Sequence, residues 1–121
     1  MNGLALCGGI GGLELGLDLA MPDYRTVCYV EREAAAAAIL VAAMEHDTLA
    51  QAPVWDDLLT FRGRQWRGVV DCVSAGFPCQ PWSASGKRQG TADERWIWPA
   101  IARMTSLGQR IATGSRFRIC G

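Results

Sequence analysis

The chain has 121 residues, half of them apolar, and its 12 basic residues balance its 12 acidic residues. This length suits one small domain with its own core, and the neutral charge is unlike that of a self-sufficient DNA-binding module, which is usually basic. One histidine and five cysteines without CxxC spacing argue against a zinc site or a disulfide scaffold, and no signal peptide or membrane-length apolar run is visible. We therefore expect a cytoplasmic protein of bacterial or phage type, with no metal and no membrane partner.

Apolar segments and helix-forming segments alternate from the start of the chain. Residues 3–7 are predicted as a strand, and the glycine cluster after it leads into a helix over Gly12–Ala20 that Pro22 ends. Arg25–Val30 is predicted as a second strand. Residues 31–44 are predicted as a helix because an alanine run gives this segment high helix propensity.

The elements predicted next along the chain are mostly shorter. Residues 52–55 are a possible third strand, 63–68 a polar loop, and 69–75 the clearest strand of the chain. A long loop over 76–95 precedes a helix predicted at 96–104. The alternation predicts an α/β fold with a parallel, doubly wound sheet, its first strand central and its ligand at the carboxyl ends of the strands.

A glycine-rich turn joins the first strand to the first helix. Glycines permit positive φ and the close approach of a ligand, so the turn suits a dinucleotide, S-adenosylmethionine (AdoMet) or simply a tight bend. Glu31 follows about 20 residues later, where a carboxylate can bind ribose hydroxyls or, alternatively, cap the next helix. Asp57, after the third strand, is a further candidate, and its alternative is a turn or N-cap aspartate.

Cys79 lies in the most unusual segment, Gly-Phe-Pro-Cys-Gln-Pro-Trp-Ser over residues 76–83. The flanking prolines exclude a regular helix or strand through the thiol. A structural cysteine would normally lie within the preceding apolar strand, whereas a loop after a strand is where an α/β protein presents a reactive group. The motif therefore favours a functional thiol over a tolerated one.

This motif, with Gly-Lys-Arg-Gln-Gly at 86–90, resembles the nucleophile loop of the DNA (cytosine-5) methyltransferases, in which phenylalanine is usual at the position of Trp82. Their first turn commonly reads Phe-x-Gly-x-Gly-Gly, which the turn here matches except that Cys7 replaces the phenylalanine. The resemblance covers about residues 3–104. It implies a Rossmann-like AdoMet-dependent methyltransferase fold, with a parallel sheet and flanking helices.

The resemblance also implies an AdoMet site, with Glu31 on the ribose, Asp57 and Leu58 at the adenine, and Arg32 at a position that often stacks on adenine. Pro78 is expected at both the cofactor and the cytosine. The residues expected to bind AdoMet are Gly9, Ile10, Gly11, Gly12, Leu13, Glu31, Arg32, Asp57, Leu58 and Pro78.

By the same resemblance, Cys79 is the catalytic nucleophile. Its thiolate would add to C6 of a cytosine flipped out of double-stranded DNA, so that C5 can take the methyl group of AdoMet. The residues expected to face the substrate or DNA are Phe77, Pro78, Gln80, Ser83, Ser85, Lys87, Arg88 and Arg95.

The segment 105–121 contains no acidic residue and no clear periodicity, so we expect it to be irregular and unrelated to the family. The family's Glu-Asn-Val segment and its target-recognition region have no counterpart here. This predicts an incomplete N-terminal part, of the kind that a frameshift or gene decay leaves, in which strand 69–75 is an exposed, aggregation-prone edge.

Three other functions stay open. The chain could be a non-catalytic AdoMet-binding fragment, or one half of a split methyltransferase whose missing motifs come from a second chain. A nicotinamide-dependent oxidoreductase would account for the glycine turn and Glu31 but not for the Pro-Cys-Gln-Pro motif. A restriction–modification role, an orphan role and a phage role are equally compatible with the sequence.

Overall fold

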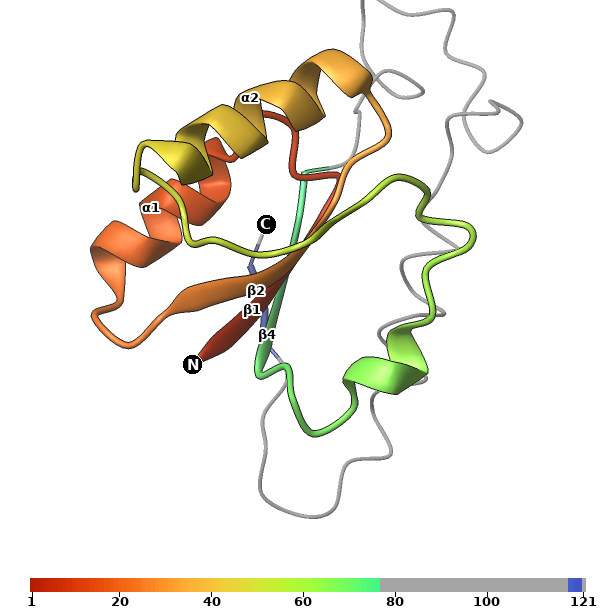
Figure 1. The fold of residues 1–121 in the computed structure, drawn as a ribbon. Coiled ribbons are helices and arrows are strands. Elements are labelled where there is room, and N and C mark those ends of the chain that lie inside the picture. Colours follow the sequence, from red (N-terminus) through yellow and green to blue (C-terminus); the bar gives the residue numbers. More distant parts are fainter. Residues whose placement is uncertain (77–117, 121) are drawn as a thin grey trace, which may run out of the picture.

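The computed structural model describes residues 1–76 and 118–120, so predictions on 77–117, including the helix at 96–104, lie outside it. The described elements are β1 (Asn2–Leu6), α1 (Gly12–Ala20), β2 (Arg25–Val30), α2 (Ala34–Glu45), β3 (Val54–Trp55), the 3₁₀ helix η1 (Gly63–Trp66), β4 (Cys72–Ala75) and β5 (Arg118–Cys120) (Figure 1). The order of elements confirms the α/β prediction. The segment predicted as a polar loop differs in kind, since it contains η1.

The strands form one parallel sheet in the order β3-β2-β1-β4-β5, with β1 central as predicted. Leu6, the last residue of β1, is level with Val30 in β2 and Ala75 in β4. The segments that follow these strands therefore leave the sheet at one edge. In a parallel sheet this carboxyl edge is where ligands bind.

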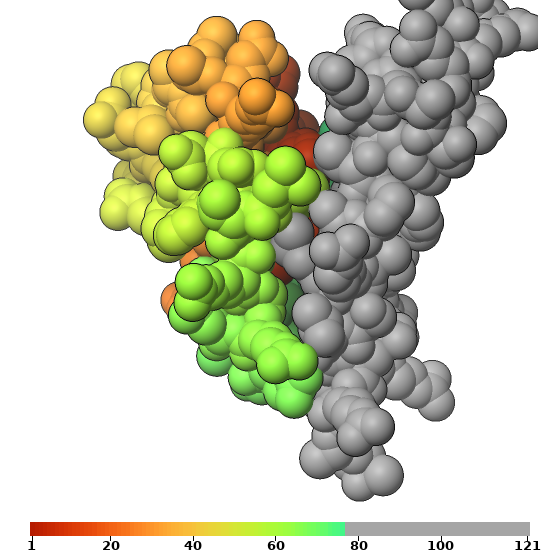
Figure 2. Space-filling view, turned by 90° about the vertical axis from the view of Figure 1, so that its right-hand side faces the viewer, coloured from red at the N-terminus to blue at the C-terminus, as the bar shows by residue number. Residues whose placement is uncertain are grey.

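Each face of the sheet buries its own apolar cluster, because successive strand residues point to opposite faces. Helices α1 and α2 lie over one face, where the buried cluster is Ala5, Tyr29, Leu40, Met44 and Leu49 (Figure 1). The segment between β3 and β4 covers the other face, and Figure 2 shows it below the first part of α2. The second cluster is Leu4, Leu6, Cys28, Val30, Leu58, Phe61, Val70 and Val73.

Helix α2 begins three residues later than predicted. Glu31 accepts a hydrogen bond from the Glu33 N–H at 2.8 Å, and Glu33, with extended backbone, is the N-cap. The acidic residues before the helix thus form a turn. At the other end, Asp47 has a left-handed φ of 52°, and the N–H groups of Asp47 and Thr48 bind the carbonyls of Met44 and Ala43, as in a Schellman motif.

Strand β5 corrects two expectations for the end of the chain. Its three residues pair in parallel with β4, from Cys72 opposite Arg118 to Ser74 opposite Cys120. The expectation of an irregular tail is therefore wrong for residues 118–120, and β4 is not an exposed edge. The physical reason is that the outer N–H and C=O groups of β4 need partners, and a short tail segment provides them.

No helix among the described residues has the length and apolar character that crossing a bilayer requires.

Candidate cofactor site at the carboxyl edge of the sheet

The glycine turn between β1 and α1 is built from left-handed backbone conformations. Cys7, Gly9 and Gly11 have φ values of 53°, 56° and 83°. The turn is closed by a hydrogen bond from the Gly11 N–H to the Gly8 carbonyl, at 2.9 Å. Gly11 is also the N-cap of α1, so this helix begins at the turn. A helix amino end favours negative charge.

The glycines of the turn differ in what surrounds them. A β-carbon on Gly11 would lie 2.4 Å from Leu49 Cδ1 and 2.9 Å from Leu40 Cδ2, so Gly11 is required by packing. A β-carbon on Gly9 or Gly12 would meet no atom of the described residues within 4 Å, apart from its chain neighbours and the helix backbone. The side of the turn at Gly9 and Gly12 is therefore open, which leaves room for a ligand to approach the backbone.

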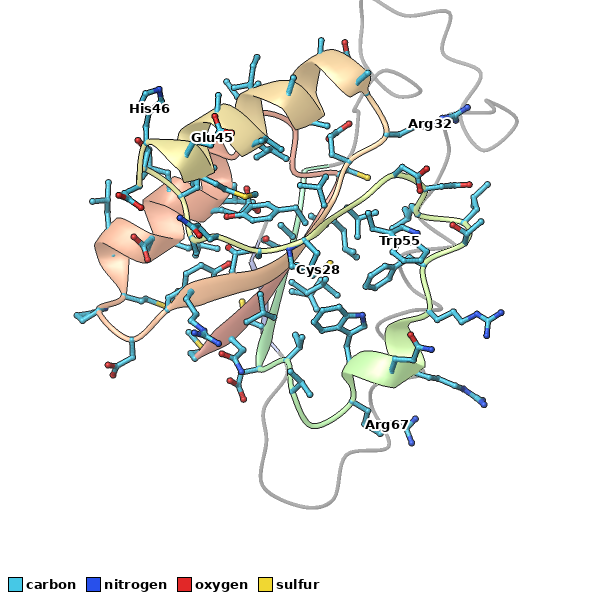
Figure 3. All side chains as sticks on the ribbon, in the orientation of Figure 1. Cys28, Arg32, Glu45, His46, Trp55 and Arg67 are labelled. Atoms are coloured by element: carbon cyan, nitrogen blue, oxygen red, sulfur yellow. The ribbon has the colours of Figure 1, made fainter. Side chains whose placement is uncertain are left out.

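Glu31 joins the end of β2 to this turn. Its Oε2 accepts a hydrogen bond from the Gly9 N–H at 2.7 Å, and its Oε1 accepts the bond from Glu33. The structure thus brings together two features that the sequence placed about 20 residues apart. Arg32, in contrast, is exposed, and Figure 3 shows its side chain extending outward from the end of β2.

Cys7 contributes a neutral thiol to the same edge. Burial, and secondarily the negative charge of Glu31, raise the pKa of the Cys7 thiol to about 11. Because both causes disfavour the thiolate, Cys7 stays protonated at neutral pH and is a poor nucleophile. Its side chain packs against the core cluster that contains Leu6 and Val30.

Asp57 has the turn role that was the alternative for it. Its Oδ1 accepts a hydrogen bond from the Leu59 N–H at 2.8 Å, and its carbonyl accepts one from the Phe61 N–H. The adjacent Leu58, which was expected at the adenine, is buried in the core with 7% of its surface exposed. The exposed large apolar side chains at this turn are Trp55 and Leu59.

The nucleophile motif begins where β4 ends. The Gly76 N–H donates to the Leu6 carbonyl at 3.0 Å, which keeps the start of the motif beside β1. The other residues predicted for catalysis and DNA contact lie outside the described residues; they are Phe77, Pro78, Cys79, Gln80, Ser83, Ser85, Lys87, Arg88 and Arg95. Within residues 1–76 and 118–120, no three His, Cys, Asp or Glu side chains gather as a metal site would need.

A family model for the C-5 cytosine-specific DNA methylases matches residues 1–108. The chain belongs to this family. Two relatives are the type II methyltransferases M.NgoMIV of Neisseria gonorrhoeae, 32% identical over 84% of this chain, and M.PspPI of a Psychrobacter species, 36% identical over 74% of it. The chain spans only 30% of the first relative and 20% of the second.

The fold of this cytosine methylase chain also matches solved structures. The DNMT2 structure of Spodoptera frugiperda has a TM-score of 0.62 and 19% identity; the match covers 85% of this chain and 30% of that one. This likeness shows the fold, a Rossmann-like sheet that is incomplete here. Members of the family depend on AdoMet. The open backbone at Gly9 and Gly12, beside a carboxylate that can accept ribose hydroxyls, fits that cofactor.

A buried carboxylate in α1 was missed by the sequence reasoning. Glu14 is 2% exposed, and its Oε1 accepts a hydrogen bond from the Ser74 hydroxyl of β4 at 2.6 Å. Its Oε2 is buried and has no hydrogen-bond partner among the described residues. An acid in the first turn of a helix normally suggests a surface position, so only the packing of α1 on the sheet shows that Glu14 is internal.

Proposed function

We propose that this cytosine methylase chain binds AdoMet at the carboxyl edge of β1 and β2 and supplies the cysteine nucleophile for methylation of C5 of cytosine in double-stranded DNA. The observation that carries the cofactor half of the proposal is the 2.7 Å hydrogen bond between Gly9 and Glu31 at the open side of the glycine turn. The family match to residues 1–108 supports the nucleophile half, because it extends across Cys79.

Three segments of the chain form the proposed cofactor site. The turn from Gly9 to Leu13 provides backbone N–H groups and open space, and the Glu31 carboxylate accepts hydrogen bonds from the ribose hydroxyls. Asp57 lies at the end of β3 and is proposed to face the adenine. When bound, AdoMet would supply an electrophilic methyl group, whose bond to the sulfonium sulfur breaks on transfer and leaves a neutral thioether.

The proposed role of Cys79 follows from the chemistry of cytosine, whose C5 is a poor nucleophile. Addition of the Cys79 thiolate to C6 makes C5 enamine-like, so that C5 can form a bond to a methyl carbon. Loss of the C5 proton to a base and departure of the thiolate then restore the aromatic ring. The cytosine must leave the duplex to reach the sulfur, for which the predicted DNA-facing residues after Cys79 are proposed to provide contacts.

A second candidate function is an AdoMet-binding fragment without activity of its own, or one half of a split enzyme. This alternative needs only the cofactor edge, whose glycine turn and Glu31 both lie within the described residues 1–76. A second chain would then supply the Glu-Asn-Val segment and the target-recognition region. We place either form in the bacterial or phage-infected cytoplasm, and a restriction–modification role agrees with the names of the relatives.

Covalent trapping distinguishes the two candidates. We would incubate the chain and AdoMet with duplex DNA in which every cytosine carries fluorine at C5, because fluorine cannot leave as a proton does and the adduct persists. The catalytic proposal predicts an SDS-stable protein–DNA adduct that Cys79→Ser abolishes and that unmodified DNA does not give. A chain that binds AdoMet but forms no adduct would support the non-catalytic or split alternative instead.

A further inference from the structure

We propose that Trp55 provides the flat surface on which the adenine ring of AdoMet stacks, the task that the family resemblance implied for the position of Arg32. This inference rests on the proposed function and adds a residue to the same site. Its basis is the position, support and exposure of the Trp55 side chain at the carboxyl edge of the sheet.

Trp55 is the last residue of β3 and is level with Val30, the last residue of β2. Its carbonyl accepts a hydrogen bond from the Glu31 N–H at 2.9 Å. Trp55 is therefore next to the residue proposed to bind the ribose. Because the adenine is bonded directly to that ribose, a ring platform for adenine has to lie close to Glu31.

The indole of Trp55 is hydrogen-bonded and packed on one side and exposed to solvent on the other. Its Nε1–H donates to the Thr60 hydroxyl at 3.0 Å, and it packs edge-to-face against buried Phe61, with ring centroids 6.2 Å apart. Despite these contacts, 46% of the Trp55 surface is exposed. A large aromatic side chain that is rigid and half-exposed loses little conformational entropy when a second ring stacks on it.

The neighbours of Trp55 complete a surface suited to a purine. Asp57 heads the turn that carries Thr60, and a carboxylate is a suitable acceptor for the amino group of adenine. Leu59 in the same turn is 74% exposed and apolar. Arg32 extends outward and Leu58 is buried in the core, whereas Trp55 lies on the face opposite the helices, beside the turn (Figure 3). Of these residues, Trp55 alone offers an exposed aromatic face.

The test is the affinity for AdoMet, measured by calorimetry on the full chain and three variants. Loss of a stacked ring predicts a dissociation constant about 10-fold higher or more for Trp55→Ala. Trp55→Leu keeps an apolar contact with Phe61 but has no aromatic face, so it should show a similar loss while preserving the fold. The matched control is Trp66→Phe, which alters the other ring stacked on Phe61, 6.0 Å away, and should leave the affinity unchanged.

The outcomes separate this inference from the proposed function. If the wild-type chain binds AdoMet and a folded Trp55→Leu variant binds it within about twofold of wild type, the Trp55 platform is wrong and the cofactor site stands. If a folded wild-type chain does not bind AdoMet, both proposals fail together. A loss in Trp66→Phe equal to that in Trp55→Leu would also overturn the inference, because the effect would then come from the aromatic cluster as a whole.

Discussion

Gly11→Ala is expected to lower the free energy of unfolding by about 2–4 kcal/mol. The new methyl group would lie 2.4 Å from Leu49 Cδ1 and 2.9 Å from Leu40 Cδ2, and both leucines belong to the cluster between α2 and the sheet. The φ of 83° adds backbone strain for any residue with a β-carbon. The substitution therefore forces either the turn or the core to move.

Gly12→Ala is the matched control, because the same methyl group one residue later meets no non-neighbouring atom within 4 Å in the described part of the chain, and the backbone there is helical. Its effect should be within about 0.5 kcal/mol. Urea unfolding followed by circular dichroism compares the two variants directly. Equal unfolding midpoints for Gly11→Ala and Gly12→Ala would mean that the packing described for this turn is incorrect.

The second large effect is expected at the buried carboxylate of α1. Ser74→Ala should lower the free energy of unfolding by about 3 kcal/mol, because it removes the hydrogen bond to Glu14 and leaves a buried carboxylate with no described partner for either oxygen. Ser74 is fully buried. Alanine differs from serine only in lacking the hydroxyl group, so the substitution changes the shape of the core little. Chemical denaturation of the variant gives the value.

A double variant separates the lost hydrogen bond from other effects of the serine. Glu14→Met combined with Ser74→Ala removes both polar partners, and such replacements are often neutral or stabilising. We therefore expect the double variant to recover most of the stability that Ser74→Ala loses. A single Ser74→Ala variant as stable as wild type would show that the Glu14–Ser74 bond contributes nothing to joining α1 to β4.

Local patterns were sufficient for most of the fold. Glycine and proline mark both ends of α1, and β2 lies between a turn and an acidic segment, so the predicted bounds of these two elements agree with the structure. Strand β4 was predicted too long because Val69 and Val70 precede it in a turn rather than in the ladder. Strand β5 could not be predicted, since its formation depends on β4, which is distant in the chain.

The position of a candidate site residue was predictable where it follows from strand order. Glu31 and the glycine turn lie at the carboxyl ends of adjacent strands, and the structure joins them as the sequence suggested. Exposure was less predictable, because it depends on tertiary packing. The sequence gives no sign that Leu58 turns into the core while Trp55 stays half-exposed.

The most direct measurement is calorimetric titration of AdoMet into the purified wild-type chain, Glu31→Ala and Glu33→Ala. We expect saturable binding by wild type, and a dissociation constant about 100-fold higher for Glu31→Ala, which loses the charged acceptor of two hydroxyl hydrogen bonds. Glu33→Ala should match wild type, because the Glu33 side chain makes no capping hydrogen bond. Glu31→Gln is a control for misfolding, because its amide oxygen can still accept the hydrogen bond from the Gly9 N–H. A folded chain that does not bind AdoMet, or a Glu31→Ala variant that binds it as tightly as wild type, would contradict the cofactor site proposed for this edge of the sheet.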